Sequence, residues 1–189
     1  FLALYFICPN GSRTAPFVLL FAAVGFIMAV MNGVPMRLGA VDNDGYNALA
    51  ISKSSEAAEA FWVQLSIVGQ SARGVRLKDM PEEWFRVPAE ESMQNSIVAV
   101  RGVLACNRLM DEQKFNQADA LMARMLAAES GMAGIHRGLL VCDRIYIELI
   151  GVARREAIEA MLTKAQAKFM KSMRRYPSVL RTEYALALL

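Results

Sequence analysis

The stretch Ala15–Val34 reads APFVLLFAAVGFIMAVMNGV and contains no charged residue. A helix of about 20 residues spans about 30 Å, which is the thickness of the hydrocarbon core of a bilayer. The uncharged run extends from Thr14 to Met36, and it is longer than the apolar core of a secretory signal peptide. The stretch therefore predicts a transmembrane helix in preference to a buried helix of a water-soluble domain.

The residues before this helix predict a second membrane segment. Phe1–Cys8 reads FLALYFIC, and the overlapping sequence CPNGSRT is typical of a tight polar turn. We expect the end of a preceding transmembrane helix here, in a protein that continues upstream. The positive-inside rule compares Arg13 with Arg37 and the later basic residues. It predicts an integral protein of the inner or cell membrane whose C-terminal part is cytoplasmic.

The rest of the chain has the composition of a water-soluble protein. All 18 acidic residues, and all basic residues except Arg13 and Arg37, lie in residues 42–189. The charge of this part is nearly balanced, so it lacks the basic excess that is typical of nucleic-acid-binding proteins. We therefore expect no nucleic-acid partner.

Apolar residues recur with helical spacing through residues 54–189. The stripes are Ala118, Leu121, Met122, Met125 and Leu126; Ala57, Phe61, Leu65 and Val68; Ile97, Val100 and Leu104; Ile135, Leu139, Cys142, Tyr146 and Leu149; and Ile158, Met161, Leu162, Ala165 and Phe169. A cap at Ser54-Ser55 is expected before the stripe that begins at Ala57. A last helix is expected to open after Pro177 and to continue to Leu189. No segment alternates with period two, so we predict an all-α fold without a substantial sheet.

The spacing of the helices favours a repeat. Predicted helix starts near Ile97, Ile135 and Val179 are about 40 residues apart, and DEQKFNQADALMARML resembles the turn and second helix of a tetratricopeptide repeat (TPR). Phe115 and Ala118 would fill the space between the paired, antiparallel helices. An irregular helical bundle is the alternative. The predicted regions are a transmembrane portion, 1–53, a helix and connector, 54–92, and a TPR-like domain, 93–189, that is suited to binding a protein partner.

The connector GVRLKDMPEEWFRVPAEE, residues 74–91, predicts a short helix. We expect Asp79 to cap this helix and Pro81 to lie in its first turn. Trp84 and Phe85 would anchor the connector onto the helical domain or onto the membrane interface.

Most catalytic patterns are missing from the sequence. The chain has one histidine, His136, so it contains no H-E-x-x-H, and it also lacks a Gly-rich phosphate loop, a G-x-S-x-G and a C-x-x-C. We interpret His136 as structural or surface-exposed. Cys8, Cys106 and Cys142 have no paired spacing, which favours reduced, buried residues over a disulfide framework or a zinc finger.

The stretch Asn32–Gly45, NGVPMRLGAVDNDG, carries the strongest functional signal. Asn32 and Pro35 form an Asn-x-x-Pro at the end of the predicted membrane helix, and an Asp-Gly follows at Asp44. This combination resembles the third motif of the site-2 protease family of intramembrane zinc metallopeptidases. The later sequences DGYNALAISKSSEAAEAFWVQL and GVRLKDMPEEWF are similar to the region that follows this motif in bacterial members.

The resemblance implies that Asp44 binds zinc, with Asp42 as the reserve candidate, and that Asn32 and Pro35 shape the approach to the site. The two histidines and the catalytic glutamate would come from an H-E-x-x-H on an earlier transmembrane helix. The parent would then be a zinc-dependent endopeptidase that cleaves membrane proteins. We expect the chain by itself to be inactive and to bind no catalytic zinc.

A second interpretation is not enzymatic. Asn-Asp-Gly is also an ordinary turn sequence, because asparagine and glycine tolerate positive φ. The chain would then be a membrane-anchored, TPR-like adaptor for protein–protein interaction. An H-E-x-x-H in an apolar segment upstream would favour the peptidase, and its absence would favour the adaptor.

Overall fold

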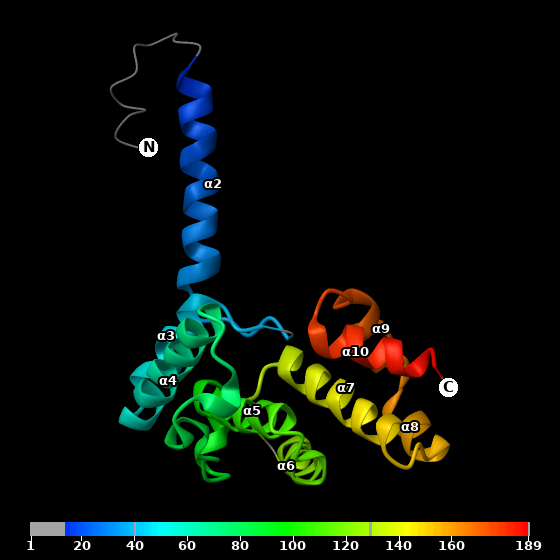
Figure 1. The fold of residues 1–189 in the computed structure, drawn as a ribbon. Helices are drawn as coiled ribbons and strands as arrows, with labels where there is room; N and C mark the ends of the chain where they lie inside the picture. Colours follow the sequence, from blue (N-terminus) through cyan, green and yellow to red (C-terminus); the bar gives the residue numbers. More distant parts are fainter. Residues whose placement is uncertain (1–13, 40, 129, 189) are drawn as a thin grey trace. The chain divides into compact units, whose positions relative to one another are not determined.

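The computed structural model describes residues 14–39, 41–128 and 130–188, and these residues form two compact units (Figure 1). The first unit comprises the described residues up to Leu38 together with Asp42–Leu49, and the second comprises the described residues of Gly39–Val41 and from Ala50 onward. Nine α-helices and no strand occur in the described chain, so the all-α prediction is confirmed. The predictions for Phe1–Cys8 and Arg13 lie outside the described residues.

The first unit contains the predicted apolar helix. Helix α2 spans Ala15–Gly33 and carries a proline in its first turn, where the missing N–H costs no hydrogen bond. Its mean hydropathy is 2.1 and none of its residues is buried. The helix is therefore long and apolar enough to cross a membrane. Helix α3, Asp44–Ser52, follows after a loop.

The second unit consists of helices α4 to α10 and three short 3₁₀ turns. The helices are α4, Ser55–Ala72; α5, Ser96–Asp111; α6, Phe115–Ala127; α7, Gly134–Ile150; α8, Arg155–Met161; α9, Lys164–Ser172; and α10, Pro177–Leu186. The 3₁₀ turns are Leu77–Asp79, Glu82–Phe85 and Ser92–Gln94. As predicted, the Ser54 hydroxyl caps α4 by accepting a hydrogen bond from the Ala57 N–H at 3.1 Å, and Pro177 begins α10.

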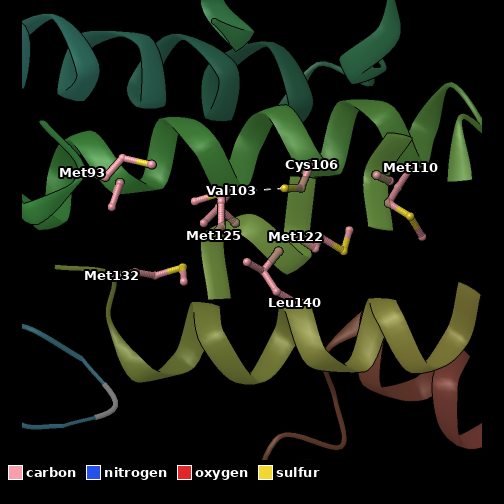
Figure 2. Packing of buried hydrophobic residues seen from close by; sticks show 10 residues of the cluster. Met93, Val103, Cys106, Met110, Met122, Met125, Met132 and Leu140 are labelled. Atoms are coloured by element: carbon pink, nitrogen blue, oxygen red, sulfur yellow. Dashed lines mark hydrogen bonds between the residues drawn. The ribbon is translucent and has the colours of Figure 1, made fainter. Parts of the chain in front are cut away.

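Methionine dominates the main core of the second unit. Helix α5 packs against α4 and α6, and the largest cluster of buried residues lies where α5, α6 and α7 meet (Figure 1). Figure 2 shows its principal side chains, which are Met93, Val103, Cys106, Met110, Met122, Met125, Met132 and Leu140. The flexible, unbranched methionine side chain fills irregular gaps, which suits a core between helices of unequal length.

Two predictions about local structure are wrong. Residues 158–169 do not form a single helix, because the chain breaks after α8 and the Thr163 hydroxyl caps α9 by accepting a hydrogen bond from the Gln166 N–H at 3.2 Å. Asp79 caps no helix and instead ends the turn Leu77–Asp79. Of the two surfaces predicted for anchoring the connector, Phe85 uses the helical domain. Its ring is buried in a cluster with Val63, Ile67, Met80 and Ala105.

The predicted stripe of α4 is only partly correct. Ala57 is buried, but Phe61, Leu65 and Val68 are exposed. The residues of α4 that face the core are Ala57, Ala60, Val63 and Ile67. Helix α4 is thus apolar on two faces, and the predicted stripe follows mainly the outer one.

The short turn between α5 and α6 depends on a left-handed residue that is not glycine. Gln113 has φ 58°, its N–H donates to the Met110 carbonyl at 3.1 Å, and the Lys114 N–H donates to the Leu109 carbonyl at 2.9 Å. Such a helix end favours glycine, because a Cβ is unfavourable at positive φ.

We therefore expect Gln113→Gly to stabilise the second unit by about 1 kcal/mol. The measurement is the urea midpoint of unfolding at unchanged m-value. Gln117→Gly is the matched control, because the same replacement inside α6 should destabilise the helix by about 1 kcal/mol. A lower midpoint for Gln113→Gly would contradict the assignment of this helix end.

Candidate functional site

The predicted motif lies at the joint between α2 and α3. After Gly33 the chain turns into extended backbone at Val34 and folds back, so that Arg37 and Asp42 face each other in an isolated antiparallel bridge. The Arg37 Nε donates to the Asp42 carboxylate at 3.2 Å, and the guanidinium also lies over the Tyr46 ring, 5.1 Å from its centre. This fold-back brings the residues before α3 to the end of α2.

Asn43 holds the joint together with four side-chain hydrogen bonds. Its carboxamide nitrogen donates to the Met31 and Val34 carbonyls, each at 2.6 Å. Its carboxamide oxygen accepts from the Met36 and Tyr46 N–H groups, each at 2.9 Å. One buried side chain therefore satisfies carbonyls at the end of α2 and also caps the start of α3.

Gly45 permits the two helices to approach each other closely. A Cβ at this position would collide with the carbonyl of Gly33 and would also crowd the carbonyl of Asn32. Both obstacles are backbone atoms, which cannot rotate away as a side chain can. The glycine of the Asp-Gly motif therefore has a steric role, since only the absence of a side chain allows the first turn of α3 to pass the end of α2.

Asp44 lies between Asn43, which is hydrogen-bonded to the end of α2, and Gly45, which packs against it. It is the first residue of α3 and it is exposed, so its carboxylate is accessible and lies in the first turn of a helix, where negative charge is favourable. Asp42 differs, because its side chain is only 7% exposed and it accepts the hydrogen bond from Arg37.

The other predicted site residues border the same joint. Asn32 lies in the last turn of α2 and Pro35 lies two residues beyond it, and both are exposed. The structure brings this stretch against Asn43 through the backbone of Met31 and Val34. Among residues 14–39, 41–128 and 130–188 there is no group of three His, Cys, Asp or Glu residues that is arranged to hold a metal. A zinc ion would therefore need further ligands beyond Asp44.

The remaining candidates for chemistry lie in the second unit. His136 is half-buried in the first turn of α7. Cys106 and Cys142 are buried and carry free thiols, as expected, and Cys8 lies outside the described residues. Burial, followed by the nearby charge of Asp143, raises the pKa of each of the two thiols to about 12. These cysteines remain protonated near neutral pH and are poor nucleophiles.

Comparison of the chain with protein-family models, with curated proteins and with solved structures gives no match. The resemblance of the Asn32–Gly45 stretch to site-2 proteases therefore stays a hypothesis that rests on the motif and on the geometry of the joint. The residue that sequence reasoning missed is Asn43. Its preference for the position just before a helix is a signal that predicts its capping of α3, but not its bonds to α2.

Proposed function

We propose that this chain is the C-terminal part of a membrane-embedded, zinc-dependent endopeptidase similar to site-2 proteases, which cleaves membrane proteins. The observation that carries the proposal is the joint at the end of α2. Asn43 binds both helices, Gly45 allows their close approach, and the exposed Asp44 lies between them. A carboxylate is thereby fixed just beyond a helix that is long enough to cross a membrane.

The joint fits one part of a zinc site. A carboxylate is a common third protein ligand of catalytic zinc beside two histidines. Asp44 is accessible and its backbone is held by the cap, whereas Asp42 is already engaged by Arg37. We assign the ligand role to Asp44 and propose that the H-E-x-x-H belongs to an earlier helix of the same protein. The chain alone is then not expected to bind catalytic zinc.

The chain's own residues prepare the site in three ways. Asp44 would hold the metal, which when bound lowers the pKa of its water to about 7 and polarises the scissile carbonyl. Asn43 keeps Asp44 in place by tying the first turn of α3 to α2. The end of α2 at Gly33, followed by extended backbone before Pro35, leaves irregular backbone that is compatible with a water-filled cavity at the membrane. Asn32 and Pro35 would guide the unwound substrate along this backbone.

The proposed location is the inner or cell membrane, with the helical unit on the cytoplasmic side. The apolar character of α2 supports membrane association, and the basic residues after Met36 favour the cytoplasmic orientation. The helical unit would recruit substrates or a partner protein, or regulate access to the site.

A non-enzymatic adaptor is the second candidate, and a pocket in the helical unit favours it. The pocket has a volume of about 500 Å³ and lies among α6, α7 and α8. Phe115, Ile147 and Met161 provide apolar lining, while Arg144 and Glu148 provide charge. Apolar lining with a few polar groups suits a peptide side chain, which is what an adaptor would bind.

The two candidates differ in what Asp44 does. In the full-length protein, reconstituted in vesicles with a transmembrane substrate, we expect Asp44→Ala to abolish cleavage and to lower the zinc content measured by mass spectrometry. Asp42→Ala is the matched control, and it should retain both. Cleavage that survives Asp44→Ala would overturn the ligand assignment. A full-length sequence without an H-E-x-x-H in an apolar segment would favour the adaptor.

A further inference from the structure

Helix α4 exposes an apolar face that the core of the second unit does not use. We call this the outer face and define it by Phe61, Trp62, Leu65 and Val68, whose exposed fractions are 36%, 57%, 55% and 65%. Residues 61–72 contain no charged side chain. The opposite face already supplies the contacts with the core through Val63 and Ile67. The outer face is therefore additional apolar surface, and a contiguous exposed apolar face of this kind marks an interaction site for a membrane or a protein.

The acidic residues of α4 do not border this face as isolated charges. The Ser92 hydroxyl donates to the Glu56 carboxylate at 2.8 Å, and the Arg101 guanidinium donates to the Glu59 carboxylate at 3.0 Å. Both carboxylates are thus engaged by other parts of the second unit. The Arg101 guanidinium offsets the charge of Glu59, whereas Glu56 stays charged at the N-terminal end of α4. Residues 61–72, which carry the outer face, contribute no negative charge of their own.

Two basic residues lie at the ends of α4. Lys53 precedes the Ser54 cap and Arg73 follows the last turn, and both are exposed. Trp62 lies on the outer face and meets Trp84 edge-on, with 5.9 Å between ring centres. Tryptophan favours the membrane–water interface, and basic residues near an amphipathic helix favour anionic headgroups.

The chain between α2 and α4 is short enough for α4 to reach a bilayer that α2 crosses. Asn43 is hydrogen-bonded to the end of α2, and only residues 44–54 separate it from α4. Even fully extended, this segment reaches no more than about 40 Å, and its helical part shortens it further. A membrane surface is therefore within reach of the outer face.

We propose that the outer face of α4 lies in the lipid–water interface of the bilayer that α2 crosses, with Lys53 and Arg73 near anionic headgroups. The helical unit then has a second attachment to the membrane, in addition to its covalent link to α2. This inference rests on the membrane location in the proposed function. It is independent of whether Asp44 binds zinc.

The test uses the full chain in phosphatidylcholine vesicles that contain anionic phosphatidylglycerol. In the Trp84→Phe variant, which keeps an aromatic ring at that position, Trp62 is the remaining tryptophan. We expect its fluorescence to be quenched by lipids brominated near the headgroup and to be protected from aqueous iodide. Adding Leu65→Asp should reduce the lipid quenching by about twofold or more, because a carboxylate is costly in the interface. Val152→Asp is the control, since Val152 is 79% exposed but lies outside α4, and it should leave the quenching unchanged.

A separate probe distinguishes failure of this inference from failure of the membrane location. In a chain whose two tryptophans are replaced by phenylalanine, Phe26→Trp places a probe within α2. Quenching of this probe by lipids brominated at the bilayer centre shows that α2 is inserted. If α2 is inserted but Trp62 is quenched by iodide, or is protected from both quenchers as by a protein partner, the inference is overturned. If the α2 probe is not quenched either, the membrane location fails and the inference fails with it.

Discussion

Replacing Gly45 with alanine is expected to open the joint between α2 and α3. The added Cβ would collide with the Gly33 carbonyl, and the collision is between backbone-fixed atoms. Relief requires the two helices to separate, which breaks the bonds that Asn43 makes to Met31 and Val34. We expect a cost of about 3 kcal/mol, since several hydrogen bonds of the joint are lost together.

The measurement is amide hydrogen exchange of the membrane-reconstituted chain. The Met36 N–H donates to the Asn43 side chain across the joint, whereas the Tyr46 N–H donates to it within the start of α3. A cost of about 3 kcal/mol corresponds to exchange faster by about a hundredfold at the Met36 amide, with a smaller change at Tyr46. Gly33→Ala is the matched control, because its Cβ would meet nothing within 4 Å. Equal exchange rates in the two variants would show that the helices do not approach each other as described.

The same variant tests whether zinc binding needs the position of Asp44 as well as its carboxylate. Gly45→Ala leaves the Asp44 carboxylate present but changes the backbone that holds it. In the full-length protein the proposed function therefore predicts lower zinc content for both Gly45→Ala and Asp44→Ala. The adaptor interpretation predicts no change in zinc content for either variant.

The helix boundaries that were predictable from the sequence depend on local contacts. Ser54 caps its helix through a hydrogen bond within one turn, and Pro177 suits the first helical position because its φ is fixed. The sequence predicts a helix start at both places. The break before α9 was missed because the apolar period continues from Ile158 to Phe169 and conceals the cap at Thr163. The apolar period favours a continuous helix and the threonine favours a new helix start, and the period alone does not decide between the two.

The features that were not predictable depend on contacts between distant residues. Asn43 was recognisable as a turn residue, but its bonds to carbonyls 9 and 12 residues earlier follow from the fold-back of the loop. Helix α4 shows the same limitation in a different form. Its sequence is apolar on two sides, so helical spacing could not tell whether Val63 or Leu65 faces the core.

Gly131→Ala is expected to be strongly destabilising in the second unit. The Gly131 N–H donates to the Met93 carbonyl at 2.8 Å, and this bond ties the segment after α6 to the turn Ser92–Gln94. A Cβ would collide with the Gln94 carbonyl and would lie 3.0 Å from the Ser96 nitrogen. Met93, whose side chain is fully buried in the main core, would have to move with its backbone. We expect a loss of about 3 kcal/mol or more in the free energy of unfolding.

Alanine substitutions at two other glycines test whether the loss of stability at Gly131 comes from a collision with backbone atoms. At Gly102 a Cβ would press on the terminal methyl of Met125, which is the movable end of a flexible side chain, so Gly102→Ala should cost less than Gly131→Ala. At Gly69, inside α4, a Cβ meets nothing within 4 Å, and alanine should stabilise the helix by about 0.5–1 kcal/mol. Urea unfolding followed by tryptophan fluorescence should therefore rank the midpoints Gly69→Ala, Gly102→Ala and Gly131→Ala from highest to lowest. Equal midpoints for Gly131→Ala and Gly102→Ala would mean that the backbone after α6 moves as easily as the Met125 side chain. That result would contradict the close contact described between Gly131 and the backbone of Gln94.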